Sequence, residues 1–260
     1  MPKIVVDDGC KINVEVEGPA GAPALMLSNS LGTNLHMWDQ QVPEFTKHFR
    51  VIRYDRRGHG QSDVPAGPYS MERFGRDVIA VLDALDIEKT NWCGLSMGGM
   101  VGQWLGANAP ERVEKLVLSN TNFHYADMAP WHERIKLVEE KGLGQLVDGN
   151  MQRWFTEGFR QRAPETIGRM KEMFVATDPK GYIGCCQAIM AMDFRESNSD
   201  IGTPTMVIVG AQDVATPPAA GEAIQKQIKG AKLASIDAAH IANMEQPDAY
   251  TKVVLDFLGA

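Results

Sequence analysis

Short apolar segments and amphipathic helices alternate along most of this 260-residue chain, and this alternation limits the possible folds more than any other feature. Ala24–Ser28 is a compact apolar run typical of a strand buried on both faces, and Met71–Leu85 has apolar residues at helical spacing. Repeated strand–helix–strand units with short connections predict a largely parallel sheet with helices on both faces. The eight predicted strands are residues 3–6, 12–17, 24–28, 50–54, 90–95, 113–119, 205–209 and 232–236.

The alternation stops between residues 123 and 198. This stretch is rich in Met, Trp, Arg and Glu, has no convincing strand, and is divided by Pro and Gly into several predicted helices. The strand–helix pattern resumes after Pro204. We therefore expect an α/β core domain of residues 1–122 and 199–260, with a helical cap of residues 123–198 inserted after the sixth of the eight strands.

The charge and the cysteines exclude several classes of function. The net charge is −7 and no basic run is present, which argues against a nucleic-acid partner or an anionic membrane surface. The N-terminal residues lack the apolar segment of a secretory signal, and no apolar run is long enough to span a bilayer. The four cysteines show no metal-ligand spacing, so we expect reduced thiols, a cytoplasmic location and no redox role for Cys185 and Cys186.

A five-residue segment, Gly94-Leu95-Ser96-Met97-Gly98, matches the pattern G-x-S-x-G. The bare pattern is weak, but here it lies between a predicted strand and a predicted helix, which is the setting that a nucleophilic serine on a sharp turn requires. Glycines are needed because a Cβ would collide with the neighbouring backbone in so tight a turn. The sequence thus predicts that Ser96 is a nucleophile held at the positive end of a helix.

A serine hydroxyl needs a base, and six histidines compete for that role. His240 follows a late strand and has small neighbours that leave room for its ring. Asp213 lies on the loop after strand 205–209, which gives the order Ser, Asp, His along the chain. Asp237 is too close to His240 in sequence to reach the imidazole edge well, and Asn120 lacks a carboxylate. We expect Asp213 to orient His240 and to stabilise its cationic form.

Acyl transfer also needs N–H donors for a developing oxyanion. The predicted donors are the backbone N–H of Met97, directly after the nucleophile, and that of Leu31, on the loop after the third strand. We expect His59 to bridge backbone groups in its own loop rather than to act as the base. The histidines and cysteines form no metal-binding cluster, so neither a metal nor another cofactor is expected.

Four segments, residues 28–38, 54–60, 94–105 and 237–247, give the chain a family resemblance. Over essentially its full length it resembles the α/β-hydrolase superfamily, and more narrowly the 3-oxoadipate enol-lactonase family. Many members of the superfamily have His-Gly where this chain has Asn29-Ser30. The version Asn-Ser-Leu-Gly-Thr, at residues 29–33, is a feature of the enol-lactonase-like group.

The resemblance implies a small anionic enol-lactone as substrate, in the β-ketoadipate pathway of aromatic catabolism. Ser96 would open the ring, and water activated by His240 would release 3-oxoadipate. A substrate carboxylate needs a cationic partner, and Arg134 in the predicted helical cap is the residue expected to supply it. Trp131 and Trp154 are further candidates for the lining of the pocket. The oligomeric state stays open.

Other reactions on a serine turn also stay open at this point. They include those of carboxylesterases, hydrolases of carbon–carbon bonds and cofactor-free perhydrolases. An aspartate nucleophile is excluded because Ser96 occupies its position. A binding protein without catalysis is a further alternative, since pockets of one fold can serve several functions. The loss of one of the three catalytic residues would mark such a protein, and the chain retains all three.

Overall fold

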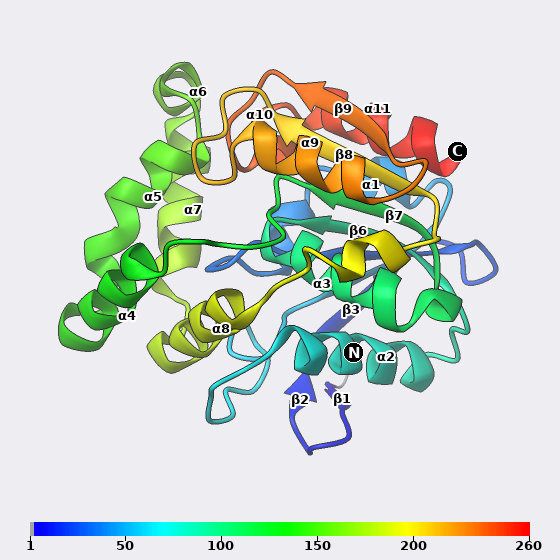
Figure 1. Cartoon of the computed structure of the whole chain (residues 1–260), viewed down its shortest axis with the longest axis horizontal. Helices are drawn as coiled ribbons and strands as arrows, with labels where there is room; N and C mark the ends of the chain where they lie inside the picture. The colour runs from blue at the N-terminus through cyan, green and yellow to red at the C-terminus, as the bar shows by residue number, and fades with distance from the viewer. Residues whose placement is uncertain (1–2) are drawn as a thin grey trace.

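The computed structural model describes residues 3–260, which form a central sheet covered by helices on both faces (Figure 1). Within these residues, seven strands make up the sheet, in the order β3-β5-β4-β6-β7-β8-β9. β3 runs antiparallel to β5, and the other neighbouring pairs are parallel, as the alternating sequence predicts. The strands are β3 (Val14–Glu17), β4 (Ala24–Ser28), β5 (Arg50–Tyr54), β6 (Thr90–Leu95), β7 (Val113–Ser119), β8 (Thr205–Gly210) and β9 (Lys232–Ile236).

The predicted count of eight strands was wrong by one. The first predicted strand pairs only within a separate two-stranded sheet, formed by β1 (Ile4–Val5) and β2 (Lys11–Ile12). The second predicted strand, residues 12–17, is interrupted at Asn13. There the backbone N–H donates to Ser62 Oγ at 2.8 Å and the side chain donates to Asp55, both on the loop after β5. Only Val14–Glu17 therefore joins the main sheet, and β7 is its fifth strand along the chain.

The two faces of the sheet are covered by different helices. On one face lie α2 (Met71–Ala84), α3 (Met97–Asn108) and α9 (Pro218–Gln227). On the other lie α1 (Val42–Phe45) and α11 (Pro247–Leu258), which contact each other (Figure 1). Most residues of β4 to β8 are buried between these helices, so their side chains form the core on both faces, whereas the edge strands β3 and β9 are partly exposed.

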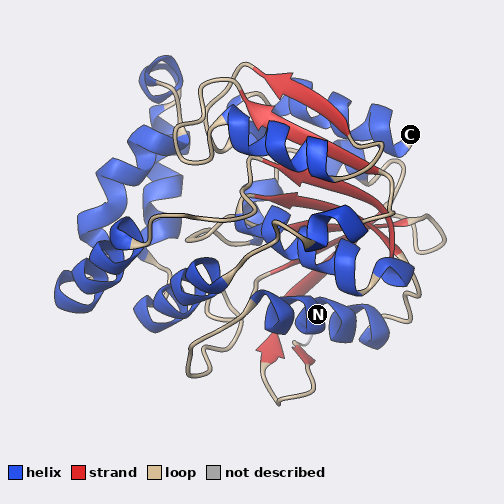
Figure 2. Cartoon of the chain, in the orientation of Figure 1, coloured by secondary structure: helices blue, strands red, loops and turns tan. Residues whose placement is uncertain are grey.

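A group of helices lies beyond the end of the sheet toward which the arrowheads of the strands point (Figure 2). The chain leaves the sheet after β7 and returns to it before β8, and the two passages are joined by a hydrogen bond from Phe194 N–H to the Phe123 carbonyl at 2.9 Å. These helices therefore lie over the carboxyl edge of the parallel strands. They are α4 (Ala129–Lys141), α5 (Val147–Trp154), α6 (Glu157–Arg162), α7 (Pro164–Val175) and α8 (Pro179–Ala191).

Local sequence signals explain where several helices begin. Ser70, Thr156 and Asp178 precede α2, α6 and α8, and each side chain accepts a backbone N–H of the first helical turn. Pro179 occupies the first position of α8, where its missing N–H costs nothing. Across residues 3–260, none of the helices has the length and apolarity needed to cross a membrane.

The loop after β5 ties distant parts of the chain together through charged side chains. The guanidinium of Arg57 makes two contacts of 2.6 Å with the Asp77 carboxylate on α2, and both side chains are only 3% exposed. A third contact, of 2.7 Å, reaches Asp8 in the N-terminal hairpin. His59 of the same loop is buried and accepts the Gly32 N–H through Nε2 at 2.9 Å. Burial, together with the charge of Arg56, lowers the pKa of His59 to about 3.

We predict that Asp77→Asn destabilises the fold strongly. Removal of the carboxylate charge leaves the buried Arg57 guanidinium with Asp8, whose side chain is 39% exposed, as its only carboxylate partner within residues 3–260, which costs about 3 kcal/mol in the free energy of unfolding. Urea denaturation measures this change. The control is Glu44→Gln, which removes an exposed partner of Lys47 and should cost less than about 1 kcal/mol. Similar losses in the two variants would contradict the prediction.

A second prediction concerns acid. The unfolded chain protonates His59 near pH 6.5, whereas the folded chain does so only at about 3. Between these values the unfolded state binds more protons, so the contribution of His59 to stability is complete above pH 6.5 and is lost as the pH falls. Replacement by Asn should reduce the pH slope of the unfolding free energy by up to about 1.4 kcal/mol per pH unit. An unchanged slope, measured by urea denaturation at several pH values, would speak against this origin.

Candidate active site

Ser96 lies on the turn between β6 and α3, in a backbone conformation that few residues other than glycine adopt. Its φ is 57° and its ψ is −114°. Two hydrogen bonds hold both backbone groups of Ser96. Its N–H donates to the Ser119 carbonyl at 2.8 Å, and its carbonyl accepts Thr121 Oγ1 at 2.7 Å. A Cβ on Gly98 would lie 2.2 Å from the Ser28 carbonyl oxygen, so only glycine fits there. Such a cluster of strain and close packing is typical of functional sites.

His240 and Asp213 form a buried pair. His240 Nδ1 lies 2.8 Å from Asp213 Oδ2, and the two side chains are 4% and 0% exposed. Because a carboxylate only accepts, the imidazole proton lies on Nδ1, and Nε2 is left as the acceptor. His240 is thus held in the tautomer that a general base requires.

The Asp213 carboxylate is surrounded by donors. It accepts the N–H groups of Ala215 and Thr216, the hydroxyl of Thr216 at 2.7 Å, and Asn120 Nδ2 at 3.0 Å. Burial alone would raise the pKa of Asp213, but the charge of His240 and these hydrogen bonds hold it below its ordinary value. Asp213 is therefore a fixed anion next to the imidazole.

Ser96 and His240 open onto one cavity of about 360 Å³ between the sheet edge and helices α4, α5 and α8. Within residues 3–260, the Ser96 hydroxyl makes no hydrogen bond, including to His240. Such contacts are often long in ligand-free enzymes and shorten when the substrate binds. The cavity thus presents a hydroxyl and an imidazole to whatever enters it.

This cavity is lined by all three residues that the sequence analysis selected from the predicted helical cap, namely Trp131, Arg134 and Trp154. Arg134 donates to Tyr182 Oη at 2.6 Å and to Asn150 Oδ1 at 3.3 Å. Its guanidinium carbon also lies 5.7 Å from the centre of the Trp131 ring. Arg134 is therefore ordered within the cavity wall rather than extended into solvent.

Arg153 is a second cavity-lining arginine, which the sequence reasoning missed. Its Nη2 donates to the same Asn150 Oδ1 at 2.8 Å, so two guanidinium groups share one neutral oxygen. Burial and then the charge of Arg134 lower the pKa of Arg153. One signal could have found it, since Asn150, Arg153 and Trp154 have the spacing i, i+3, i+4 of a single helix face. The two arginines favour an anion at this end of the cavity.

Of the two predicted oxyanion donors, Leu31 lines the cavity, whereas Met97 is buried as the first residue of α3. In the part of the chain that the structure describes, neither backbone N–H donates to a protein atom. Leu31 lies on the turn after β4. The next peptide helps to hold this turn in place, because the Gly32 N–H donates to His59 Nε2. His59 thus bridges to a neighbouring loop, not only to groups of its own loop.

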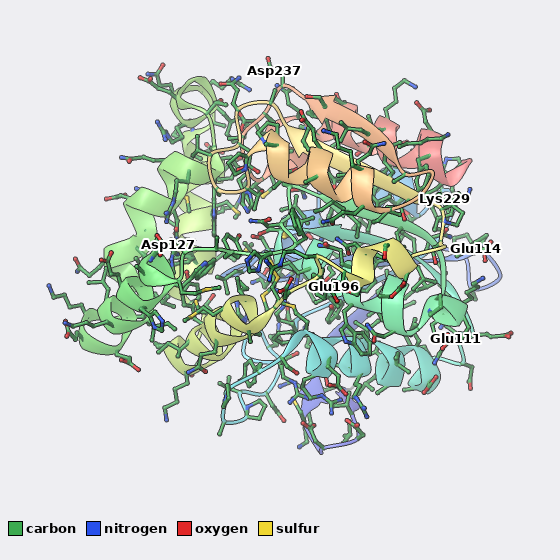
Figure 3. The ribbon with its side chains drawn as sticks, in the orientation of Figure 1. Glu111, Glu114, Asp127, Glu196, Lys229 and Asp237 are labelled. Carbon is green, nitrogen blue, oxygen red and sulfur yellow. The ribbon has the colours of Figure 1, made fainter. Side chains whose placement is uncertain are left out.

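Of the two residues considered as rivals of Asp213, one lies away from the site and the other lies beside Asp213 in a different role. Asp237 is exposed at the outer edge of the molecule in Figure 3, where it accepts Gln212 Nε2 at 2.7 Å. Asn120 does contribute, but as a donor to Asp213. Asp127, also labelled in Figure 3, precedes α4, is exposed and lines the cavity. Residues 3–260 contain no group of three or more His, Cys, Asp or Glu placed to hold a metal ion.

Comparisons with known proteins show the family of the chain. The model of the alpha/beta hydrolase fold family matches residues 23–247. The 3-oxoadipate enol-lactonase 2 of Acinetobacter baylyi is 41% identical over 243 residues, which is 94% of this chain and 91% of that protein. The crystal structure of the enol-lactonase from Burkholderia xenovorans LB400 matches with a TM-score of 0.97 and 41% identity over 100% of both chains.

A more distant solved structure, a thermophilic esterase from Thermogutta terrifontis, matches with a TM-score of 0.91 and 27% identity over 99% of this chain and 96% of that one. The family match covers most of the sequence, from β4 to β9, and includes the turn that carries Ser96. The chain belongs to the α/β-hydrolase fold family, and within that family it is similar over nearly its whole length to 3-oxoadipate enol-lactonases.

Proposed function

We propose that the protein hydrolyses 3-oxoadipate enol-lactone to 3-oxoadipate, a reaction of the β-ketoadipate pathway of aromatic catabolism. The observation that carries the proposal is the composition of one cavity. Ser96 and the His240–Asp213 pair lie on its sheet side, and the two arginines Arg134 and Arg153 lie on its helical side. The similarity to enol-lactonases from two organisms supports the same substrate.

In this proposal Ser96 Oγ attacks the lactone carbonyl while His240 Nε2 takes the hydroxyl proton. Asp213 stabilises the imidazolium that results. The N–H groups of Leu31 and Met97 bind the oxyanion of the tetrahedral intermediate. Collapse breaks the ring C–O bond, and the leaving enolate oxygen takes the proton from His240. The enol then tautomerises to the ketone.

The acyl group is released in a second addition. His240 removes a proton from a water molecule, whose oxygen attacks the ester carbon attached to Ser96. Collapse of this intermediate returns the proton to Ser96 Oγ and frees the new carboxylate. One water is consumed for each lactone, and the product carries two carboxylates.

We propose that residues 123–198 act as a cap that recognises the substrate. The lactone carries one carboxylate, for which the Arg134 and Arg153 guanidiniums provide charge-assisted hydrogen bonds. Trp131 and Trp154 supply apolar walls for the ring. The net charge of −7 fits a small-molecule substrate better than a nucleic acid. All four cysteines are unpaired, which supports a cytoplasmic location.

A second candidate function is the hydrolysis of small neutral esters. The observation in its favour is the structural match to the esterase from Thermogutta terrifontis. The serine chemistry would be the same, and the difference would lie in whether the two arginines are used. Activity on an anionic lactone and on a neutral ester therefore has to be compared directly.

We predict that the protein turns over enzymatically generated 3-oxoadipate enol-lactone and that Ser96→Ala lowers kcat at least ~10³-fold, because the nucleophile is lost. Loss of the lactone is followed by its ultraviolet absorbance. Ser235→Ala, an exposed serine on β9, is the control and should keep full activity. Rapid hydrolysis of p-nitrophenyl acetate without turnover of the lactone would instead favour the second candidate.

We also predict that Arg134→Gln and Arg153→Gln each raise KM for the lactone about tenfold or more, since a hydrogen bond to a charged group contributes about 1.5–3 kcal/mol. The KM for neutral p-nitrophenyl acetate should change less than about twofold, because this ester has no carboxylate. Steady-state kinetics on both substrates measure the difference. Arg162→Gln, an exposed arginine on α6, is the matched control. Equal losses on the two substrates would rule out carboxylate recognition.

A further inference from the structure

Arg56 is a buried arginine whose surroundings differ from those of its neighbour Arg57. The two residues are 2% and 3% exposed. Arg57 bonds to carboxylates, whereas Arg56 donates to backbone carbonyls, from Nη1 to the Ser30 oxygen at 3.2 Å and from Nη2 to the Asn29 oxygen. Its Nε has no partner within residues 3–260. Its positive charge is therefore directed at the loop after β4.

The carbonyl of Ser30 and the N–H of Leu31 belong to one planar peptide group. Three donors act on the oxygen end of this group, namely Arg56 Nη1, Thr33 Oγ1 at 2.9 Å and Thr33 N–H at 3.4 Å. The N–H end has no protein acceptor within residues 3–260, and Leu31 lines the cavity. Fixing the oxygen end therefore also fixes the direction of the Leu31 N–H.

A cation at the oxygen end also changes the strength of this N–H as a donor. Hydrogen bonds polarise one another in a medium of low dielectric constant, so a charge on the carbonyl oxygen makes the N–H of the same peptide a stronger donor. Burial of an arginine without a carboxylate is costly, and burial lowers the pKa of Arg56. The cost of burying Arg56 is explained if its charge helps to stabilise a negative charge that develops in the cavity during the reaction.

We propose that Arg56 is a positioning residue for catalysis, which orients and polarises the Ser30–Leu31 peptide so that the Leu31 N–H stabilises the oxyanion. Arg56 acts through the peptide and does not touch the substrate. The inference rests on the proposed function to the extent that Leu31 is an oxyanion donor. His59 supports the same loop at the next peptide, where it accepts the Gly32 N–H at 2.9 Å.

The test compares Arg56→Lys with Arg57→Lys, the same substitution at adjacent buried arginines. Lysine keeps the charge but cannot hold two carbonyls with a planar fork. For Arg56→Lys we expect kcat to fall about 10–100-fold on both the enol-lactone and p-nitrophenyl acetate, with KM changed less than about threefold, because one donor of an oxyanion hole is worth up to about 10³ in kcat. Arg57→Lys should lower the melting temperature and leave kcat within about twofold.

A tetrahedral mimic separates this role from a loss of folding. Phenylboronic acid forms an anionic tetrahedral adduct with a nucleophilic serine, and its inhibition constant on p-nitrophenyl acetate reports the strength of the oxyanion site. In Arg56→Lys this constant should rise by about the factor by which kcat falls, and in Arg57→Lys it should not change. A folded Arg56→Lys protein with wild-type kcat, or a loss of kcat that the boronate does not follow, would overturn the proposal.

If Arg56→Lys does not fold, Thr33→Val and Thr33→Ser test the polarisation of the same peptide. Thr33→Val removes the hydroxyl that donates to the Ser30 carbonyl, and Thr33→Ser retains it. Thr33→Val should lower kcat about 3–10-fold with a parallel loss of boronate affinity, and Thr33→Ser should restore both. Equal kcat values in the two variants would overturn the proposal.

Wild type and Ser96→Ala are measured beside these variants. Turnover of the ester but not of the lactone would refute the enol-lactonase function alone. The role of Arg56 would then be tested by kcat and boronate inhibition with p-nitrophenyl acetate as the substrate. Retention of ester hydrolysis in Ser96→Ala would refute the serine site and this proposal together.

Discussion

The close contact of backbones at the end of β6 is the constraint on which the rest of the molecule depends. A Cβ on Gly94 would lie 2.1 Å from the Gly98 carbonyl oxygen, and a Cβ on Gly98 would lie 2.2 Å from that of Ser28. The strand can therefore turn into α3 only because both positions lack side chains. The unfavourable φ of Ser96 is retained because the surrounding sheet and helix leave the turn no alternative.

The parallel sheet brings the remaining groups to that turn. β4, β6, β7 and β8 end at the same edge, so the loops that follow them meet although they are far apart in sequence. Asn120 after β7 donates to Asp213 after β8, and Asp213 holds His240. The loop after β4 is held in turn by Arg56 and His59 from the loop after β5. The candidate site is thus a set of neighbouring loops that fix one another.

Much of this arrangement could be predicted because it depends on order along the chain. The strand–turn–helix pattern around Ser96, and an acid and a histidine after later strands, follow from local signals. The strand count failed because Asn13 bonds to a distant loop, and no local pattern indicates that contact. Arg153 was missed because its relation to Arg134 depends on how two helices pack. The carbonyl partners of Arg56 are likewise invisible in sequence, since backbone oxygens carry no residue identity.

The place at which the helical segment joins the sheet has a consequence for how such proteins diversify. Residues 124 and 193 form an isolated antiparallel bridge, so the chain departs and returns at almost one point. A different insert could be accommodated there without a change in the order of the strands or in the turn that carries Ser96. Under the proposed function, the part of the protein that selects a molecule and the part that cleaves it are then free to change at different rates. Descendants of one scaffold could acquire new substrates by replacing a single module.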